Sequence, residues 1–422
     1  MKFYLFSLII VFAVVFAFGQ ENNNSANLDF MYKEVIKLPS FKDQFNAKQK
    51  ADFNQKVEDL KVNAASNTDY EIFMKLYSLI QPIRDSHLGL MSNPDSVLNE
   101  SFKTEKLNPD SLLKAAINKP INSVEGLYFN QNYQYIIYRD EDYYKGVAIF
   151  DGIIYLQFML YELTPNHFDL ISFFKNGKII SLTRNVVYSN QYLVGTPFKK
   201  NNQKDFINVD VKEEKFQLSQ IDNKTSYLRL GTFATTNVNV PIIKKFYAKV
   251  KDSINKNNLV VDLRNNGGGG FRASGEFLRL IKSYKGNVHL MVNCNTNSNA
   301  EQFVIRLMNK ENVTIYGETT RGYIAYGNNR GTRPASPNNK FLFYITDMGA
   351  GKKDFEFWPT NVWTWRIPDP IIAGFKGETT FKSTQIHNQS EVTYAKVSPK
   401  SLYEAQLSLR FGKLPNWFKD LK

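Results

Sequence analysis

Two polar segments follow apolar runs in the second half of the chain, and both carry residues suited to acyl-transfer chemistry. The apolar run 259–261 leads through Asp262 to four consecutive glycines at 267–270. Glycine allows positive φ and leaves backbone N–H groups unshielded, as an oxyanion requires. A second run, 288–293, leads to Ser298, after which apolar residues recur at helical spacing. We therefore expect Ser298 at a helix N-terminus, opposite a glycine loop.

Three interpretations of this junction compete. In the first, Ser298 is an N-cap and Glu301 completes an S-x-x-E capping box, and such caps are far commoner than nucleophiles. The second makes the glycines a phosphate cradle, but neither G-x-G-x-x-G nor G-x-x-x-x-G-K-[ST] fits residues 267–274. The third makes Ser298 a nucleophile and the glycine loop part of its oxyanion hole.

The order and spacing of three motifs favour the third interpretation. The motifs are VVDLRNNGGG at 260–269, TNSNAE at 296–301 and GETTRG at 317–322. Together they resemble the signature of the tail-specific, or C-terminal-processing, serine peptidases, over about residues 222–375. The resemblance implies an α/β fold with a crotonase-like ββα core and a mostly parallel sheet. It also implies a serine peptidase that forms an acyl-enzyme on Ser298.

One position departs from the pattern of the tail-specific enzymes. They pair the serine with a lysine just after the third motif, where this chain has Tyr323. Phenols ordinarily have a pKa of about 10, so they are poor general bases at neutral pH. The segment D-S-H-L at 85–88 resembles the histidine segment of the tricorn-like branch of this family. That resemblance implies His87 as the general base and Ser86 as the residue that orients its ring.

The resemblance also assigns the remaining roles. The backbone N–H groups of Gly268 and Asn299 are expected to bind the oxyanion, helped by the positive end of the helix that follows Ser298. The tricorn-like branch uses a distal glutamate, for which Glu356 is the best candidate by order along the chain and Asp354 the second. A solvated loop carboxylate is the alternative interpretation of Glu356.

The remaining histidines and the single cysteine are given structural roles. His167 and His387 are interpreted as surface or satisfied core residues, and His289 lies inside the predicted strand 288–293. Cys294 is expected to be a small buried hydrophobe, and a single cysteine excludes an intramolecular disulfide. No Cys, His and carboxylate cluster has metal-ligand spacing, so we expect no cofactor and no metal.

The N-terminus predicts export. Lys2, the apolar run 3–18 and a small-residue boundary near Gly19 are typical of a secretory signal peptide. The run is shorter than the roughly 20 residues of a membrane-spanning helix, so no stable membrane insertion is expected after cleavage. We therefore expect a periplasmic or secreted protein of a bacterial envelope. The formal charge of +13 comes from scattered Lys and Arg, which favours a solvated basic surface and no nucleic-acid partner.

The pattern along the chain predicts four regions. These are a signal peptide at 1–19, a helical region at 20–95, a β-rich module (small barrel or sandwich) at 96–215 and the peptidase core at 216–422. In the module, aromatic and β-branched runs alternate with turns, and Asn-Gly at 176–177 predicts a hairpin. From Thr225 strands alternate with helices, which implies βαβ units with catalytic groups at the carboxyl ends of the strands. No PDZ-like G-D-x-I run is found.

Two other functions stay open at this point. A catalytically silent envelope protein that binds peptides or ligands could use the same fold, and Tyr323 and the unusual S-N-A-E sequence favour it. An esterase or other acyl hydrolase could use the same serine. A peptide or protein is the expected partner of a peptidase. Hydrogen-bond reach between Ser298 and His87 would favour an enzyme, whereas a remote His87 would favour the binding protein.

Overall fold

The computed structural model describes residues 24–96, 98, 107–130, 133–174, 179–189, 191–200, 214–293, 295–308, 310–317, 320–324, 326–328 and 333–349. Several predictions fall outside these residues: the signal peptide at 1–19, the turn at 176–177, Cys294, Asp354, Glu356 and His387. Within the described part of the chain, no helix has the length and apolar character needed to cross a membrane.

Helices and strands are named in chain order. The helices are α2 (Asn24–Val35), α3 (Pro39–Gln44), α4 (Ala47–Lys61), the 3-10 turn η1 (Ala64–Ser66), α5 (Asp69–Ile80), α6 (Pro109–Ile117), α7 (Asn239–Val250), α8 (Phe271–Ser283) and α9 (Asn299–Met308). The strands are β1 (Gly89–Ser92), β2 (Gly126–Asn130), β3 (Tyr133–Asp140), β4 (Tyr143–Phe150), β5 (Ile153–Thr164), β6 (His167–Phe174), β7 (Ile179–Ser189), β8 (Tyr192–Val194), β9 (Phe216–Asp222), β10 (Thr225–Leu230), β11 (Asn258–Asp262), β12 (Asn287–Val292), β13 (Val313–Gly317) and β14 (Phe341–Tyr344).

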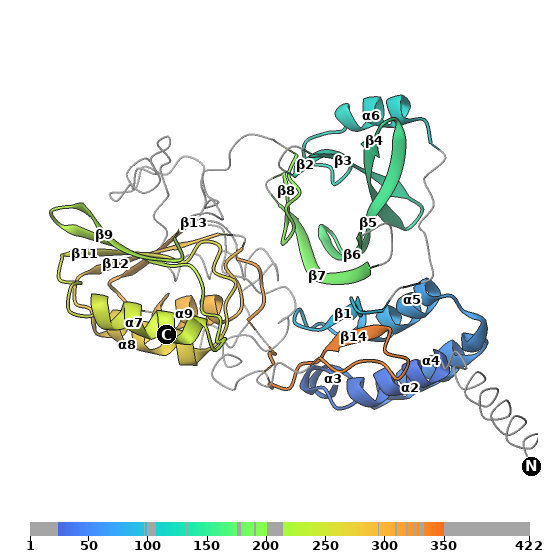
Figure 1. Cartoon of the computed structure of the whole chain (residues 1–422), viewed down its shortest axis with the longest axis horizontal. Coiled ribbons are helices and arrows are strands. Elements are labelled where there is room, and N and C mark those ends of the chain that lie inside the picture. Colours follow the sequence, from blue (N-terminus) through green and yellow to red (C-terminus); the bar gives the residue numbers. More distant parts are fainter. Residues whose placement is uncertain are drawn as a thin grey trace, which may run out of the picture.

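The smaller sheet carries the glycine loop and Ser298. Its order is β13-β12-β11-β10-β9, and β10 to β13 run parallel to one another. Helices α7, α8 and α9 lie on one face of this sheet (Figure 1). Parallel neighbours require crossover connections, and the chain between 231 and 312 supplies one helix per crossover. The glycine loop follows β11 and Ser298 follows β12, so both lie at the carboxyl ends of adjacent strands.

The larger sheet is antiparallel. Its order is β14-β1-β7-β6-β5-β4-β3-β2, with β8 also paired to β7. Its strands β2 to β7 follow one another closely in the sequence, which antiparallel neighbours allow. The prediction of a mostly parallel sheet therefore applies only to β10–β13, because β9 is antiparallel to β10 and the main sheet is antiparallel throughout. The described residues therefore form a mixed α/β fold.

Two strands of the larger sheet come from outside the predicted β module. β1 follows the N-terminal helices, and β14 lies more than 240 residues later along the chain, yet the two strands pair over their whole length. Helices α2 to α5 pack beside them, and their apolar faces share one core with side chains of β5, β6 and β7 (Figure 1). The predicted region boundaries stay predictions, but the sheet itself continues across the boundary at 95.

Capping signals agree with the helix starts near the site. Asn46 and Thr68 each form a capping box with the residue three positions on, which begins α4 and α5. Helix α5 buries Ile72, Phe73 and Leu76 and ends at Ile80, and the segment 81–88, which carries His87, follows it directly. The region predicted to be helical, 20–95, contains α2 to α5 followed by β1.

Candidate active site

Ser298 does not have the conformation of an ordinary N-cap. N-cap residues usually have extended backbone, whereas Ser298 has a φ of 53°. Its backbone N–H donates to Glu301 Oε2 at 2.7 Å, so one half of the S-x-x-E box is formed. Its hydroxyl lies 3.1 Å from Nε2 of His87. The structure thus places the predicted nucleophile and the predicted base within hydrogen-bond distance.

His87 is positioned through its backbone and its ring. Asp85, which is nearly fully buried, accepts the His87 backbone N–H at 3.0 Å and the Thr346 hydroxyl at 2.7 Å. The ring of Tyr323 packs edge-on against the imidazole, with ring centroids 5.1 Å apart and an interplanar angle of 76°. Tyr323 therefore packs against one side of the His87 ring.

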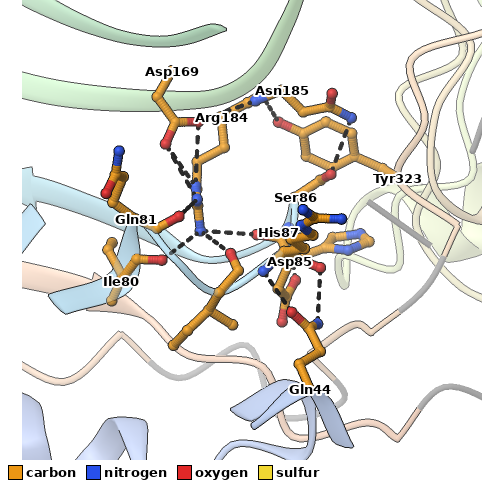
Figure 2. Close-up of polar contacts among 12 residues, drawn as sticks. Gln44, Ile80, Gln81, Asp85, Ser86, His87, Asp169, Arg184, Asn185 and Tyr323 are labelled. Atoms are coloured by element: carbon orange, nitrogen blue, oxygen red, sulfur yellow. Dashed lines mark hydrogen bonds and ion pairs between the residues drawn. The ribbon is translucent and has the colours of Figure 1, made fainter. Parts of the chain in front are cut away.

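A buried arginine holds the turn that leads to His87. The side chains of Arg184 and Asp169 are both fully buried and form an ion pair at 3.2 Å. The guanidinium also donates to four carbonyl oxygens of this turn, and Figure 2 shows how it reaches them. The carbonyls belong to Ile80, Gln81, Ile83 and Asp85. No pattern in the sequence predicted this contact, because Arg184 lies about 100 residues from the turn.

Ser86 lies beside His87 but its hydroxyl bonds elsewhere. It donates to the Gly322 carbonyl oxygen at 3.3 Å and accepts from Asn185 Nδ2 at 3.1 Å. These bonds connect the His87 segment to β7 and to the loop after β13. Asn185 also donates to the Gly322 carbonyl oxygen at 3.4 Å. The predicted role of Ser86 in orienting the ring stays a prediction.

Glu301 is fully buried behind the serine and accepts four hydrogen bonds. Its Oε2 accepts the backbone N–H groups of Ser298 and Tyr323, at 2.7 and 2.8 Å. Its Oε1 accepts the Thr320 hydroxyl at 2.6 Å and the Gly322 N–H at 2.7 Å. Burial raises the pKa of Glu301, and the four donors oppose that change. One carboxylate thus ties the Ser298 backbone to Tyr323, the residue that packs on His87.

The glycine loop lies directly against Ser298. Gly268 has a φ of 82°, and a Cβ there would lie 2.8 Å from Ser298 Cβ and 2.9 Å from the Asn299 nitrogen. Its N–H donates to the Asn266 side-chain oxygen at 2.9 Å, so this predicted oxyanion donor is engaged here. Asn299 begins α9, and its backbone N–H donates to no acceptor among the described residues.

A charged cluster fixes the strand end from which the glycine loop departs. Asp262 is fully buried and accepts from Arg264 Nε at 2.9 Å and from the Tyr227 hydroxyl at 2.7 Å. Arg229 Nη1 lies 3.2 Å from Oδ2 of the same carboxylate. Burial alone would raise the pKa of Asp262, but the Arg264 and Arg229 guanidinium groups outweigh it and hold that pKa well below its usual range.

The other described histidines are part of strands. His289 is buried in β12, and its Nδ1 lies 3.2 Å from the Tyr316 hydroxyl, as expected for a core residue. His167 begins β6. Among the described residues, no group of three His, Cys, Asp or Glu side chains is arranged to hold a metal ion.

Comparisons with known proteins give distant likenesses. A family model described as a domain of unknown function, DUF4955, matches residues 284–421, less than half of the chain. No match was found among curated proteins. A lipoprotein from Streptococcus agalactiae is similar at 14% identity with a TM-score of 0.26, over 32% of this chain and 59% of its own.

Proteases are among the similar solved structures. The photosystem II D1 C-terminal processing protease is 12% identical with a TM-score of 0.35, over 77% of this chain and 88% of its own. The tricorn protease is 11% identical with a TM-score of 0.35, over 90% of this chain and 35% of its own. Likenesses this distant carry no argument for function, which must come from the site.

Proposed function

We propose that this protein is a serine peptidase that cleaves peptide bonds through an acyl-enzyme on Ser298, with His87 as its general base. The observation that carries this proposal is the 3.1 Å contact between Ser298 Oγ and His87 Nε2, made by a serine with a φ of 53°. A strained backbone at a strand-to-helix junction is typical of a nucleophile held out for attack. Both side chains are half-buried, so a substrate can reach them.

In the proposed reaction, protons move through Ser298 Oγ and His87 Nε2, and both atoms regain their starting protonation. Ser298 Oγ bonds to the carbonyl carbon while its proton passes to His87 Nε2. The carbon–nitrogen bond then breaks, and the leaving nitrogen takes that proton. Water next attacks the ester carbon and gives a proton to Nε2, and the ester bond breaks as Ser298 Oγ recovers the proton. Each cycle therefore returns both residues to their starting state.

The oxyanion is assigned to backbone donors beside Ser298. The Asn299 N–H at the start of α9 is the first donor, supported by the positive end of the helix dipole. Gly268 was predicted as the second donor, and it would have to exchange its bond to Asn266 for one to the oxyanion. The loop approaches Ser298 closely enough for this exchange only because residue 268 is glycine.

The finer predictions belong to the same proposal. We assign the core to the crotonase-like fold and the chain to the tricorn-like branch, because His87 occupies the position of a base and Tyr323 that of the missing lysine. Glu356 as the distal acid, cleavage of a signal peptide near Gly19 and export to a bacterial periplasm or beyond complete the proposal. The motif spacing and the composition of the N-terminal run support these assignments.

Peptide-bond cleavage is the activity to test. The mature protein would be incubated with a mixed peptide library and new termini would be identified by mass spectrometry. The wild type should produce new termini that Ser298→Ala and His87→Ala do not. Ser283→Ala, an exposed serine on α8, and His167→Gln are matched controls and should behave as wild type. Ester hydrolysis without peptide cleavage would make the protein an esterase and overturn the peptidase assignment.

A further inference from the structure

A cavity of about 260 Å³ opens beside His87, between β1, β7 and β14. β1 pairs with β14 over four residues but with β7 only at Met91 and Ser181. The residues of β1 and β7 that line the cavity extend from that single pair toward His87. β1 and β7 therefore part from one another toward the base, and the cavity fills the fork between them.

The position of the cavity assigns it to one half of a substrate. His87 and Tyr323 are among its lining residues, whereas Ser298 and Asn299 are not among them. In the proposed reaction His87 protonates the leaving nitrogen, so the chain that follows the cleaved bond lies on the side of His87. Provided that the proposed function holds, the cavity is where this leaving segment would bind.

The walls of the cavity define the chemistry of the leaving segment. Leu88, Leu90 and Leu182 contribute buried apolar surface. Of the two arginines that line it, Arg184 is paired with Asp169. Arg333 is exposed, lies over the Tyr344 ring at 5.6 Å and forms no ion pair with any carboxylate in the described part of the chain. A guanidinium that has no carboxylate partner among the described residues, beside an apolar wall, suits a ligand that is apolar at one end and anionic at the other.

We propose that this cavity binds the segment of a peptide substrate that follows the cleaved bond, with an apolar first residue and a carboxylate facing Arg333. The carboxylate belongs either to an acidic side chain or to the chain terminus, since Arg333 recognises the same group in both. The apolar first residue packs on Leu88, Leu90 and Leu182. Its free amine, once released, lies next to His87.

Binding of product-like peptides to the mature wild-type protein tests this proposal without requiring turnover. Calorimetry would compare Leu-Ala-Glu-amide with Leu-Ala-Gln-amide, and Leu-Ala-Ala with a free C-terminus against its amide. One acidic form or both should bind about 10-fold more tightly than its neutral match, as expected for one added charge-assisted hydrogen bond. The pair that shows the difference identifies the source of the carboxylate. Lys-Ala-Glu-amide should bind more weakly than Leu-Ala-Glu-amide.

Arg333→Glu should remove the preference for acidic peptides and favour Leu-Ala-Lys-amide, whereas Arg333→Lys should keep part of it. Lys244→Glu makes the same charge change at an exposed position on α7 and should leave the preference unchanged. Equal affinities for all peptides, or an unchanged preference in Arg333→Glu, would overturn the proposal. Labelling of Ser298 by a fluorophosphonate, measured in parallel, reports on the proposed function alone, so the two can fail separately.

Discussion

Ser298 has a backbone conformation that its neighbours must maintain. A non-glycine residue with positive φ costs on the order of 1–3 kcal/mol, and surrounding contacts have to hold it there. Glu301 supplies such contacts, because its carboxylate accepts hydrogen bonds from the Ser298 and Tyr323 N–H groups. The S-x-x-E pattern predicted a contact between Ser298 and Glu301, but it was interpreted as an ordinary helix cap. In the structure the same carboxylate also holds the loop 320–323 that faces His87.

Replacing Glu301 by Gln should impair both stability and the site. Gln places an amide donor against backbone donors, and each buried N–H left without an acceptor costs about 1–3 kcal/mol of the free energy of unfolding. We expect fluorophosphonate labelling of Ser298 to slow by about 100-fold, since small displacements in a site cost that much. Urea unfolding and labelling rates would be measured beside the exposed control Glu311→Gln. Wild-type values for Glu301→Gln would contradict this role.

Gly268 should tolerate no side chain. An alanine Cβ would lie 2.6 Å from the Asn297 carbonyl oxygen as well as against Ser298, and its φ of 82° disfavours any Cβ. The loop would move away and oxyanion donors with it, so we expect a loss of about 100- to 1,000-fold in kcat for Gly268→Ala. Gly267→Ala is the matched control, because nothing lies within 4 Å of an added Cβ there. Equal peptide-cleavage rates for the two variants would contradict the prediction.

The sequence predicted the residues that belong to motifs and missed the residues that position them. Ser298 and His87 were predicted because their neighbours and their spacing resemble those of a known family, and the structure brings the two side chains within 3.1 Å of each other. Arg184 and Asn185 carry no motif, and their contacts join segments about 100 residues apart, so only the folded chain reveals them. Tyr323 was recognised as a departure, but its packing on the imidazole was not foreseen.

At the scale of elements, the turn after α5 depends on one buried ion pair. Arg184→Met would leave the Asp169 carboxylate buried and unpaired and four carbonyls of the turn without their donor. Removing one partner of such a pair costs about 3–5 kcal/mol of the free energy of unfolding. Urea denaturation should show this loss, while Lys37→Met, which removes an exposed pair, should stay within about 0.5 kcal/mol of wild type. A loss that small in Arg184→Met would exclude the proposed role of the pair.

The end of β11 should give the protein a specific sensitivity to acid. The folded pKa of Asp262 is depressed below its unfolded value of about 3.9, so its stabilising contribution is fully present above that pH. The contribution is lost as the pH falls through the folded value. The urea concentration at which half of the wild type is unfolded should therefore decrease as the pH is lowered below about 4. Asp262→Asn should be less stable at pH 7 and should change less with pH, and parallel curves for the two proteins would contradict this.

Elements with local signals were predicted, and elements that depend on distant pairing were not. The alternation of strands and helices from Thr225 appears as β10 to β13 with α7 to α9, because apolar periodicity is a local property. The orientation of β9 and the pairing of β1 with β14 depend on partners that periodicity does not identify. For this reason the sequence predicted the β-rich module at 96–215, but not that β1 and β14 belong to the same sheet.

At the scale of the whole molecule, the site exists only where three parts of the chain meet. His87 follows the N-terminal helices, Ser298 belongs to the smaller sheet, and β7 of the larger sheet holds both sides through Arg184 and Asn185. Arg321 reaches from the Ser298 side into the larger sheet, where Gly195 leaves room for its guanidinium. His87 and Ser298 are 211 residues apart in sequence, so the proposed activity would require the whole folded chain.

Labelling of the mature protein with a fluorophosphonate probe tests the central claim most directly. The probe reacts with activated serines, and the modified peptide identifies the residue. If His87 activates Ser298, the wild type should be labelled at Ser298, and Ser298→Ala and His87→Ala should each abolish the label while remaining folded. If the folded wild type is not labelled, or His87→Ala is labelled as fast as the wild type, His87 is not the base for Ser298, and a peptide-binding protein becomes the better account.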